Sequence, residues 1–419
     1  MKFIKLTTNY PQYTQDFYSR HVGLEKAPFA QQRAMLEADA FGGNGGWGPA
    51  LEALGHEYVE IVANVRPLQK SWAVEYGAPW SEVSWKTSVP CFQAEAFKPE
   101  IVFMDAPRDF DVAWLKHLRE RCPSIRLILG WSQSPCDEFD VLRYYDALLS
   151  GSHFMLDHYS KKGCRTAFLR LGFNRKVLTQ LPPPAIEEDP SITFSGGVAR
   201  GKDRHGERER LLEAIVQSSV PLRLYSAPPG VTPIRDALST TARRGAYGAM
   251  QMLAAIGVSP RTRRRLPVIG KAATWTSMPL SQISKSLWPH MRPSVYGLEM
   301  YKVLRQSAVS LNTHIDCTGP DAANLRLYEA TGVGSCLLTD SKSNLCELFE
   351  LDKEVVAYRS ADECIEKGKW LLEHPQERRA IAAAGQSRTL RDHTMENRAV
   401  ELDAIVTRLL AATSASLAY

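Results

Sequence analysis

Short apolar runs alternate with longer segments of helical periodicity along the first 180 residues. The apolar runs, which predict strands, are 58–62, 99–105, 125–129, 147–149 and 167–171. The segments with the apolar spacing of helices are 28–40, 49–55, 110–121 and 153–163. Short apolar strands that alternate with helices predict a parallel sheet with helices on its faces.

The same alternation resumes after residues 181–190, a polar, proline-dense segment that is typical of a linker. The strands predicted beyond it are 192–195, 221–225, 308–312, 335–339 and 354–358. The predicted helices are 207–218, 297–306, 322–331, 344–349, 361–373, 376–384 and 395–411. Two such α/β units predict a cleft between the carboxyl ends of their sheets, which is where these sheets bind ligands.

Residues 226–290 interrupt this rhythm, and we interpret them as an insertion in the second unit. A long helical stretch at 232–257 precedes a basic cluster, Arg261–Arg265, and no clean strand is visible. The cluster could contact an anionic membrane or a lipid-linked acceptor, or it could be a solvated basic loop.

Composition narrows the class of protein. The chain has 419 residues, 44% hydrophobic and 23% charged, which is normal for a soluble globular protein of two or three domains. No run of about 20 apolar residues predicts a membrane span. The N-terminus turns polar at Thr7, so we expect no secretory leader. The net charge of +5 suits an anionic ligand and does not indicate nucleic-acid binding.

Eight scattered cysteines form no CxxC pair, so neither a zinc site nor a disulfide framework is expected. No DxD dyad follows a predicted strand. We therefore expect a cytoplasmic protein without a bound metal or other cofactor, which could also be peripheral at the inner face of a membrane through its basic cluster.

The run 311–340 contains the most informative chemistry. A strand ends at Asn312, and a helix is predicted to open at Asp321, where its first N–H groups could bind a diphosphate. Glu329, two turns further, could accept hydrogen bonds from both hydroxyls of a ribose. Periodicity alone favours a simpler interpretation, an ordinary helix with Glu329 exposed.

A resemblance to a known family favours the ligand-binding interpretation of this run over the simpler one. The run NLRLYEATGVGSCLLTD (324–340), followed by LCELF (345–349), resembles the C-terminal domain of the CgeB-like glycosyltransferases. That group is similar to the retaining glycosyltransferase family 4. Residues 296–314 and a closing helix at 393–409 also fit. The similarity covers 290–410 well, the N-terminal half loosely and 226–290 hardly at all.

The resemblance implies the GT-B fold, an α/β architecture of two Rossmann-like parallel-sheet domains that face a cleft. We expect an N-terminal acceptor-side domain at 1–182 and a C-terminal nucleotide-sugar-binding domain at 183–392, with the insertion at about 226–290. The last segment, 393–419, is expected to be a helix that packs back toward the N-terminal domain.

The resemblance also implies residues that contact the donor. Glu329 matches a glutamate that holds the ribose, and Asp321 stands where the family has a glutamate that contacts the sugar. Arg326 could offset phosphate charge, or it could pair with Glu329 one helical turn away. Asn312, His314 and Asn324 fit the family pattern at or near this run.

A glycine turn, Gly196-Gly197, follows the strand 192–195 and precedes Arg200 and Lys202. It resembles the loop with which GT-B enzymes grip the diphosphate, because glycine permits close approach and cations stabilise the leaving charge. A solvated loop is an equal alternative. Arg208 falls where the family often has an arginine, but we expect it at the surface.

Several residues of the first unit follow predicted strands or a glycine-rich loop, Gly42–Gly48. They are the acceptor-side candidates Asn44, Trp47 and Trp131 and the catalytic candidates Asp105 and His153. A histidine at a strand-to-helix junction is more often structural than catalytic. Asp321 and Glu329 complete the catalytic candidates.

The predicted activity is transfer of a sugar from a nucleoside-diphosphate donor to a glycan, protein or small-molecule acceptor. A retaining enzyme of this group needs no strong nucleophile, whereas an inverting one needs a general base, which His153 or Asp105 could supply. The alternatives are an inactive GT-B binding or structural protein and a sugar-nucleotide epimerase of the same architecture.

Overall fold

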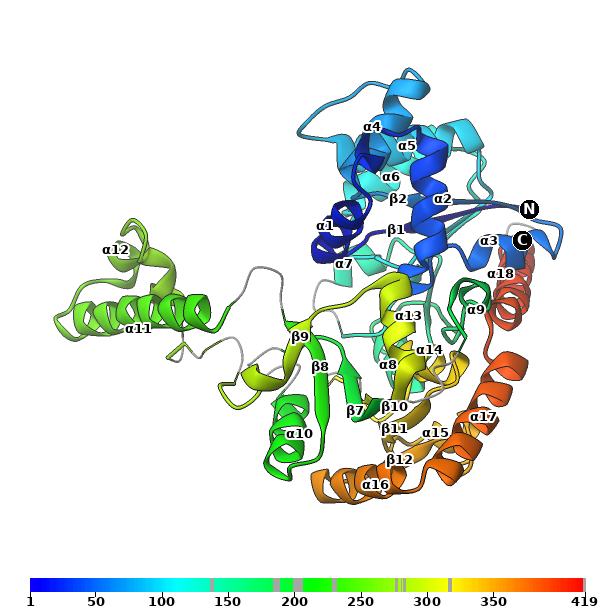
Figure 1. Cartoon of the computed structure of the whole chain (residues 1–419). Coiled ribbons are helices and arrows are strands. Elements are labelled where there is room, and N and C mark those ends of the chain that lie inside the picture. Colours follow the sequence, from blue (N-terminus) through cyan, green and yellow to red (C-terminus); the bar gives the residue numbers. More distant parts are fainter. Residues whose placement is uncertain are drawn as a thin grey trace.

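The computed structural model contains two parallel sheets of six strands each, with helices packed on both faces (Figure 1). It describes residues 1–135, 139–183, 189–198, 206–227, 232–275, 278–279, 281, 284–315 and 319–416. The Rossmann-like alternation predicted from the sequence is confirmed in both halves of the chain.

The first sheet has the order β2-β1-β3-β4-β5-β6. Its strands are β1 Lys2–Thr7, β2 Glu57–Val62, β3 Ile101–Met104, β4 Leu127–Trp131, β5 Ala147–Ser150 and β6 Thr166–Phe168. Its helices are α1 Pro11–Arg20, α2 Phe29–Asp39, α3 Trp47–Glu52, α4 Arg66–Glu75, α5 Trp85–Phe97, α6 Val112–Arg121, α7 Phe139–Leu142, α8 His153–Ser160 and α9 Val177–Gln180. Strand β1 and helices α1, α4, α5, α7 and α9 were not predicted.

Burial on both faces explains why these strands read as continuous apolar runs. In β3, Ile101 and Phe103 belong to one core cluster, whereas Val102 and Met104 point into the cluster on the opposite face. Successive side chains of a strand alternate between faces, so a sheet covered on both sides needs apolar residues at every position.

The second sheet has the order β12-β11-β10-β7-β8-β9, which is the strand order of the dinucleotide-binding fold. Its strands are β7 Asp189–Ser195, β8 Leu222–Ala227, β9 Met291–Pro293, β10 Ser307–Asn312, β11 Cys336–Asp340 and β12 Val356–Tyr358. Its helices are α10 Gly206–Gln217, α13 Gly297–Gln306, α14 Arg326–Gly332, α15 Leu345–Leu348, α16 Ala361–Glu373 and α17 Pro375–Asp392.

The segment between β8 and β9 forms a helical unit of its own. It contains α11 Pro233–Ala255, α12 Pro260–Arg264 and the 3-10 helices η3 Gly270–Thr274 and η4 Trp288–His290. Helix α11 packs on α12 and η3, and in Figure 1 α11 and α12 lie to one side of both sheets. Among the described residues, no helix is long and apolar enough to cross a membrane.

Between α17 and α18 the chain crosses from the second half of the fold back to the first half. Helix α17 packs on α14 and β11, and helix α18, Met395–Ser416, packs on α3 (red and blue in Figure 1). The crossing is fixed by backbone hydrogen bonds, from Phe173 N to His393 O at 2.8 Å and from Met395 N to Phe173 O at 3.0 Å. The C-terminal helix therefore joins the two halves.

We expect His393, which lies at this crossing, to make the folded protein less stable at acidic pH. Burial lowers the pKa of His393 to about 4, and its Nε2 hydrogen bond to Leu348 O offsets only part of that effect. The unfolded chain, with an ordinary histidine pKa, binds this proton more readily, so stability falls as pH drops from about 6.5 to 4. We expect a loss of about 3 kcal/mol from this group.

Urea unfolding at pH 7 and pH 5 checks this expectation. A His393→Gln variant cannot take up the proton and should lose less stability between the two pH values than the wild-type protein does. An identical loss in the variant would contradict the assignment to His393.

Two carboxylates tie the domains together in a reciprocal way. Asp39, at the end of α2, accepts a hydrogen bond from Leu298 N in the first turn of α13 at 3.3 Å. Asp321, which follows β10, accepts one from Phe154 N in the first turn of α8 at 3.0 Å. A negative charge at a helix N-terminus is stabilising. Each domain thus caps a helix of the other, and residues that follow strand ends in both sheets meet at the junction.

Gly297 is required by the first of these contacts. It has a φ of +54°, and a Cβ at this position would overlap the Asp39 carboxylate and approach the Asp39 carbonyl oxygen at 2.7 Å. We expect Gly297→Ala to destabilise the protein by about 3–5 kcal/mol, from backbone strain together with overpacking. Denaturant unfolding measures this loss.

Gly23 provides a matched control. Its φ is +88°, but a Cβ there would have no atom within 4 Å. Gly23→Ala should therefore cost only the backbone strain of about 1–2 kcal/mol. Equal losses at the two positions would show that close packing against Asp39 is unimportant.

Candidate functional site

The carboxyl end of β7 leads into Gly196-Gly197, and a buried arginine holds this turn. Arg208 on α10 donates hydrogen bonds to Gly197 O at 2.8 Å and to Thr313 O, just past β10, at 2.6 Å. Its guanidinium also lies over the Phe194 ring, 5.4 Å from the centroid. The expectation that Arg208 lies at the surface is wrong, since 8% of the residue is exposed. Its match to the family's arginine was the signal in the sequence.

The two glycines of the turn differ in their surroundings. A Cβ at Gly196 would lie 3.2 Å from the Phe194 ring, whereas one at Gly197 would have no atom within 4 Å. Gly197 therefore borders open space in which a ligand could approach the backbone. Arg200 and Lys202 lie outside the described residues, so their contact with a diphosphate stays a prediction.

Buried Glu329 and partly buried Arg326 form an ion pair next to this turn. Glu329 is 5% exposed, so the simpler interpretation of an exposed glutamate is wrong. Its Oε2 lies 3.0 Å from an Arg326 nitrogen, and its Oε1 accepts a hydrogen bond from the Tyr301 hydroxyl at 3.3 Å. Arg326 also donates to Ser195 O at 3.1 Å. Of the two roles considered for Arg326, pairing with Glu329 is present.

The Glu329 carboxylate has capacity for further partners. Burial raises its pKa, while the charge of Arg326 and the Tyr301 hydroxyl offset part of the rise. Two carboxylate oxygens offer about four lone-pair sites, and the two hydrogen bonds described here use about half of that capacity. Lone pairs for about two further donors therefore remain on this carboxylate.

The helix expected to open at Asp321 begins later, at Arg326. The intervening backbone is held by side chains instead of a helical turn: Ala322 N donates to Asn344 Oδ1 at 2.7 Å, and Ala323 N donates to His314 Nε2 at 3.3 Å. The anion site expected at an Asp321 helix N-terminus is therefore not formed in that way.

His314 supports this irregular segment. Its Nδ1 lies 2.7 Å from Asp340 Oδ1, and its Nε2 accepts from Ala323 N, which places the ring proton on Nδ1. Burial alone would raise the pKa of Asp340, but the hydrogen bonds from His314 outweigh it and lower that pKa. Both ring nitrogens are engaged within the protein.

Asn312 and Asn324 join the same edge. Asn324 Nδ2 donates to Asn312 Oδ1 at 2.7 Å, and Asn312 Nδ2 donates to Thr339 Oγ1 at 3.0 Å. The structure thus brings together, at the carboxyl ends of β7, β10 and β11, nearly all described residues predicted to bind the donor. They are Gly196, Gly197, Asn312, His314, Asn324, Arg326 and Glu329.

Asp321 lies at the domain junction. Its Oδ2 accepts from Ser152 Oγ at 2.9 Å and from Phe154 N, and its Oδ1 accepts from Ser343 Oγ at 3.0 Å. Burial opposes the charged form, but these hydrogen bonds outweigh it and lower the pKa of Asp321. The carboxylate is engaged by protein groups, so its predicted contact with the sugar would require the two domains to separate here.

His153 lies beside this junction with its side chain exposed. Its ring stacks on Phe168, with centroids 4.3 Å apart and an interplanar angle of 7°. Its charge, when protonated, contributes to the lowered pKa of Asp321. The structure therefore places these two catalytic candidates next to each other.

Asp105 belongs to a buried charged cluster in the first sheet. Lys5 Nζ lies 2.8 Å from Glu60 Oε1, 3.1 Å from Asp105 Oδ2 and 3.3 Å from Asn44 Oδ1. Burial disfavours the ammonium ion, but the two carboxylates outweigh it and raise the pKa of Lys5. The Asp105 side chain keeps 25% exposure, so it remains accessible.

The glycine-rich loop packs into the protein. Gly43 and Gly46 lie against Met395, where a Cβ would come within 2.8 Å of its side chain. Trp47, predicted on the acceptor side, is 5% exposed and packs edge-on against Phe103 in the core. Trp131 is partly buried and donates to Leu169 O at 3.3 Å.

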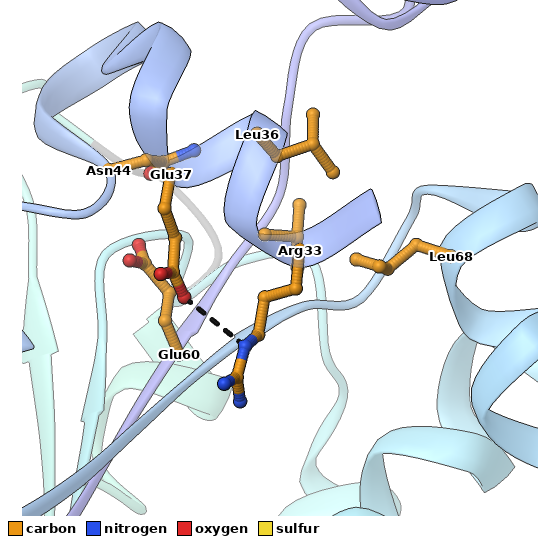
Figure 2. A pocket seen from close by; sticks show the side chains of 7 residues that line it. Arg33, Leu36, Glu37, Asn44, Glu60 and Leu68 are labelled. Carbon is orange, nitrogen blue, oxygen red and sulfur yellow. Dashed lines mark ion pairs between the residues drawn. The ribbon is translucent and has the colours of Figure 1, made fainter. Parts of the chain in front are cut away.

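Asn44 borders a small pocket beside the Lys5 cluster. Figure 2 shows side chains that line it, among them Glu60 and Arg33, which pairs with Glu37 at 3.5 Å. The residues that line it are Arg33, Leu36, Glu37, Asn44, Glu60, Val62 and Leu68. In the described part of the chain, no group of three or more histidine, cysteine or acidic side chains is placed to hold a metal ion.

Part of this chain is similar to a known protein family. A family model described as glycosyl transferase-like matches residues 250–404, which contain β9 to β12 and the first part of α18. None of the curated protein sequences matches the chain.

Solved structures match over nearly the whole length. Sucrose-phosphate synthase from Thermosynechococcus elongatus is 12% identical, with 98% of this chain and 100% of that chain covered and a TM-score of 0.51. Anabaena Alr3699/HepE, solved with UDP-glucose, is 11% identical, with coverages of 97% and 100% and a TM-score of 0.53. AviGT4, a glycosyltransferase involved in avilamycin A biosynthesis, is 14% identical, covers 98% of each chain and gives 0.51.

The chain has the GT-B fold. These identities are too low to transfer residue roles, so the roles in this chain depend on its own geometry. The family match together with the GT-B neighbours supports a glycosyltransferase enzyme.

Proposed function

We propose that this protein transfers a sugar from a nucleoside-diphosphate donor bound at the carboxyl edge of the second sheet. The observation that carries the proposal is the convergence of a buried arginine, a partly buried arginine and a buried glutamate there. Arg208 and Arg326 donate hydrogen bonds to carbonyl groups of the Ser195–Gly197 turn, and Glu329 forms an ion pair with Arg326. Such a site offers positive charge to a diphosphate and a carboxylate to a ribose.

The arginines have a chemical task in this proposal. Cleavage of the sugar–phosphate bond leaves negative charge on the departing diphosphate. Guanidinium groups fixed before the reaction stabilise that charge without reorganisation. Because Arg208 and Arg326 are already held by backbone carbonyls, they are positioned in advance, and we propose that transfer is independent of a metal.

The identity of the donor is proposed from related structures. Alr3699/HepE was solved with UDP and with UDP-glucose, so UDP-sugars are the first donors to test. We also propose CgeB-like, family 4-type membership and a retaining reaction with a glycan, protein or small-molecule acceptor. For an inverting reaction, His153 and Asp105 remain the candidate bases, since both keep exposed surface.

Thermal unfolding with a panel of UDP-, GDP- and dTDP-sugars tests the proposal. A ligand at a hundredfold excess over its Kd stabilises the folded state by about 2.7 kcal/mol, which should raise Tm by about 2–5 °C. Free sugars serve as the control and should have no effect. Failure of every nucleotide to raise Tm would contradict the proposal.

Product analysis separates the alternatives. A transferase should hydrolyse the stabilising donor slowly when no acceptor is present. An inactive binding protein would bind the donor and leave it intact, and an epimerase would return a donor epimerised at C2.

A further inference from the structure

Helix α11 exposes a stripe of large apolar side chains. Ile234 is 72%, Leu238 66% and Met252 72% exposed, and Ile256, which follows the helix, is 75% exposed. Their separations of 4, 14 and 4 residues place them on one side of a helix with 3.6 residues per turn. Solvent-exposed apolar side chains gathered on one face of a helix indicate an interaction surface.

The opposite side of α11 already has its partner. Asp236, Thr240 and Met250 are buried there, and α11 packs on α12 and η3. The insertion thus builds its small core with one face of the helix. The apolar stripe is left outside that core, on a unit that lies to one side of both sheets (Figure 1).

The same unit is strongly basic. Between Thr232 and Trp275 the sequence has eight lysine or arginine residues and one acidic residue, Asp236, which is 3% exposed. The chain as a whole is nearly balanced, with 51 basic and 46 acidic residues. Arg261, Arg264 and Arg265 of the predicted basic cluster are exposed at and just after α12.

We propose that this surface, the stripe Ile234, Leu238, Met252 and Ile256 with the exposed arginines Arg235 and Arg244 of the same helix, docks onto an anionic lipid bilayer. At 100° per residue these two arginines lie on either flank of the stripe, and apolar side chains flanked by arginines are the pattern of helices that lie in the membrane interface. A second copy of the chain would bring two basic surfaces together, and their repulsion opposes such a dimer.

The position of the unit suits this docking. It leaves the second sheet after β8, which runs parallel to β7 and therefore ends at the same edge as the Ser195–Gly197 turn. Docking would hold that edge close to the lipid surface. The inference goes beyond the proposed transfer reaction and does not depend on it.

Vesicle flotation of the full chain without any nucleotide sugar tests the proposal. The protein should float with vesicles of phosphatidylcholine and phosphatidylglycerol at low salt, and much less with phosphatidylcholine alone. Binding should weaken as added salt screens the arginines. Each arginine near an anionic surface is worth about 1 kcal/mol, so R235E/R244E should bind about thirtyfold more weakly or worse.

Matched variants separate the surface from general effects. Replacing Ile234, Leu238, Met252 and Ile256 with serine should also weaken flotation, because the inserted apolar area is lost. Val22→Ser with Val83→Ser removes equally exposed apolar side chains of the first domain. Lys26→Glu with Lys86→Glu and Lys116→Glu removes three exposed cations there. Both control variants should float like the wild-type protein.

Three results would overturn the proposal. They are absence of flotation with anionic vesicles at low salt, flotation of the R235E/R244E variant equal to wild type, and flotation lost equally in the control variants. A concentration-dependent dimer in analytical ultracentrifugation that the serine variant abolishes would assign the surface to a second copy of the chain instead.

Discussion

Replacing Glu329 with alanine should weaken donor binding by about a hundredfold or more. In the proposed site its carboxylate accepts both ribose hydroxyls, and a hydrogen bond to a charged group contributes about 1.5–3 kcal/mol. The buried carboxylate also balances Arg326, which would be left without its counter-ion. Isothermal titration with the stabilising nucleotide sugar measures the loss.

Two further variants make this result interpretable. Glu329→Gln keeps the size of the side chain and a hydrogen-bond acceptor for Tyr301, so it should fold normally and still bind the donor weakly. Glu299→Ala removes an exposed glutamate on α13 that pairs with Lys302, and it should bind like wild type. A folded Glu329→Ala protein with wild-type affinity would refute the ribose role.

Replacing Arg208 with alanine should lower both stability and activity. The guanidinium bridges carbonyls that follow two neighbouring strands, Gly197 after β7 and Thr313 after β10. Loss of these two charge-assisted hydrogen bonds should destabilise the protein by about 2–4 kcal/mol. Removal of its charge should also lower kcat/KM by about a hundredfold or more.

Arg210 on the same helix is the matched control. It is exposed and donates to Gly206 O at 3.1 Å, so Arg210→Ala should change stability by less than about 0.5 kcal/mol. Arg208→Lys should rescue only partly, because a single ammonium group does not reproduce the planar fork of guanidinium donors. Urea unfolding and steady-state kinetics measure these effects. The bridging role would be contradicted if Arg208→Ala and Arg210→Ala had the same free energy of unfolding and the same kcat/KM.

The strands and helices could be predicted from the sequence wherever neighbouring residues form a clear apolar pattern. Continuous apolar runs marked most strands, because both faces of each sheet are covered. Strand β1 was missed because Lys5 interrupts its apolar pattern. The groups that make Lys5 tolerable inside the protein, Glu60 and Asp105, are far away in the sequence. A compensated buried charge leaves no local signal.

The donor-binding residues at the carboxyl edge of the second sheet were predicted in part, again where a local sequence pattern marks them. Gly196 and Asn312 were recognisable because each lies at or just past the end of an apolar strand. Arg208 was misplaced because its partners are backbone carbonyls, which have no side-chain signature. Periodicity could not place Glu329, since every residue from Leu327 to Gly332 in α14 is buried and the helix has almost no polar face.

A crystal structure with the nucleotide sugar that stabilises the protein tests the donor site most directly. The prediction is a diphosphate at the Gly196-Gly197 turn, close to Arg208 and Arg326, with both ribose hydroxyls hydrogen-bonded to Glu329. A nucleotide bound elsewhere, or bound at this edge with its ribose turned away from Glu329, would contradict it.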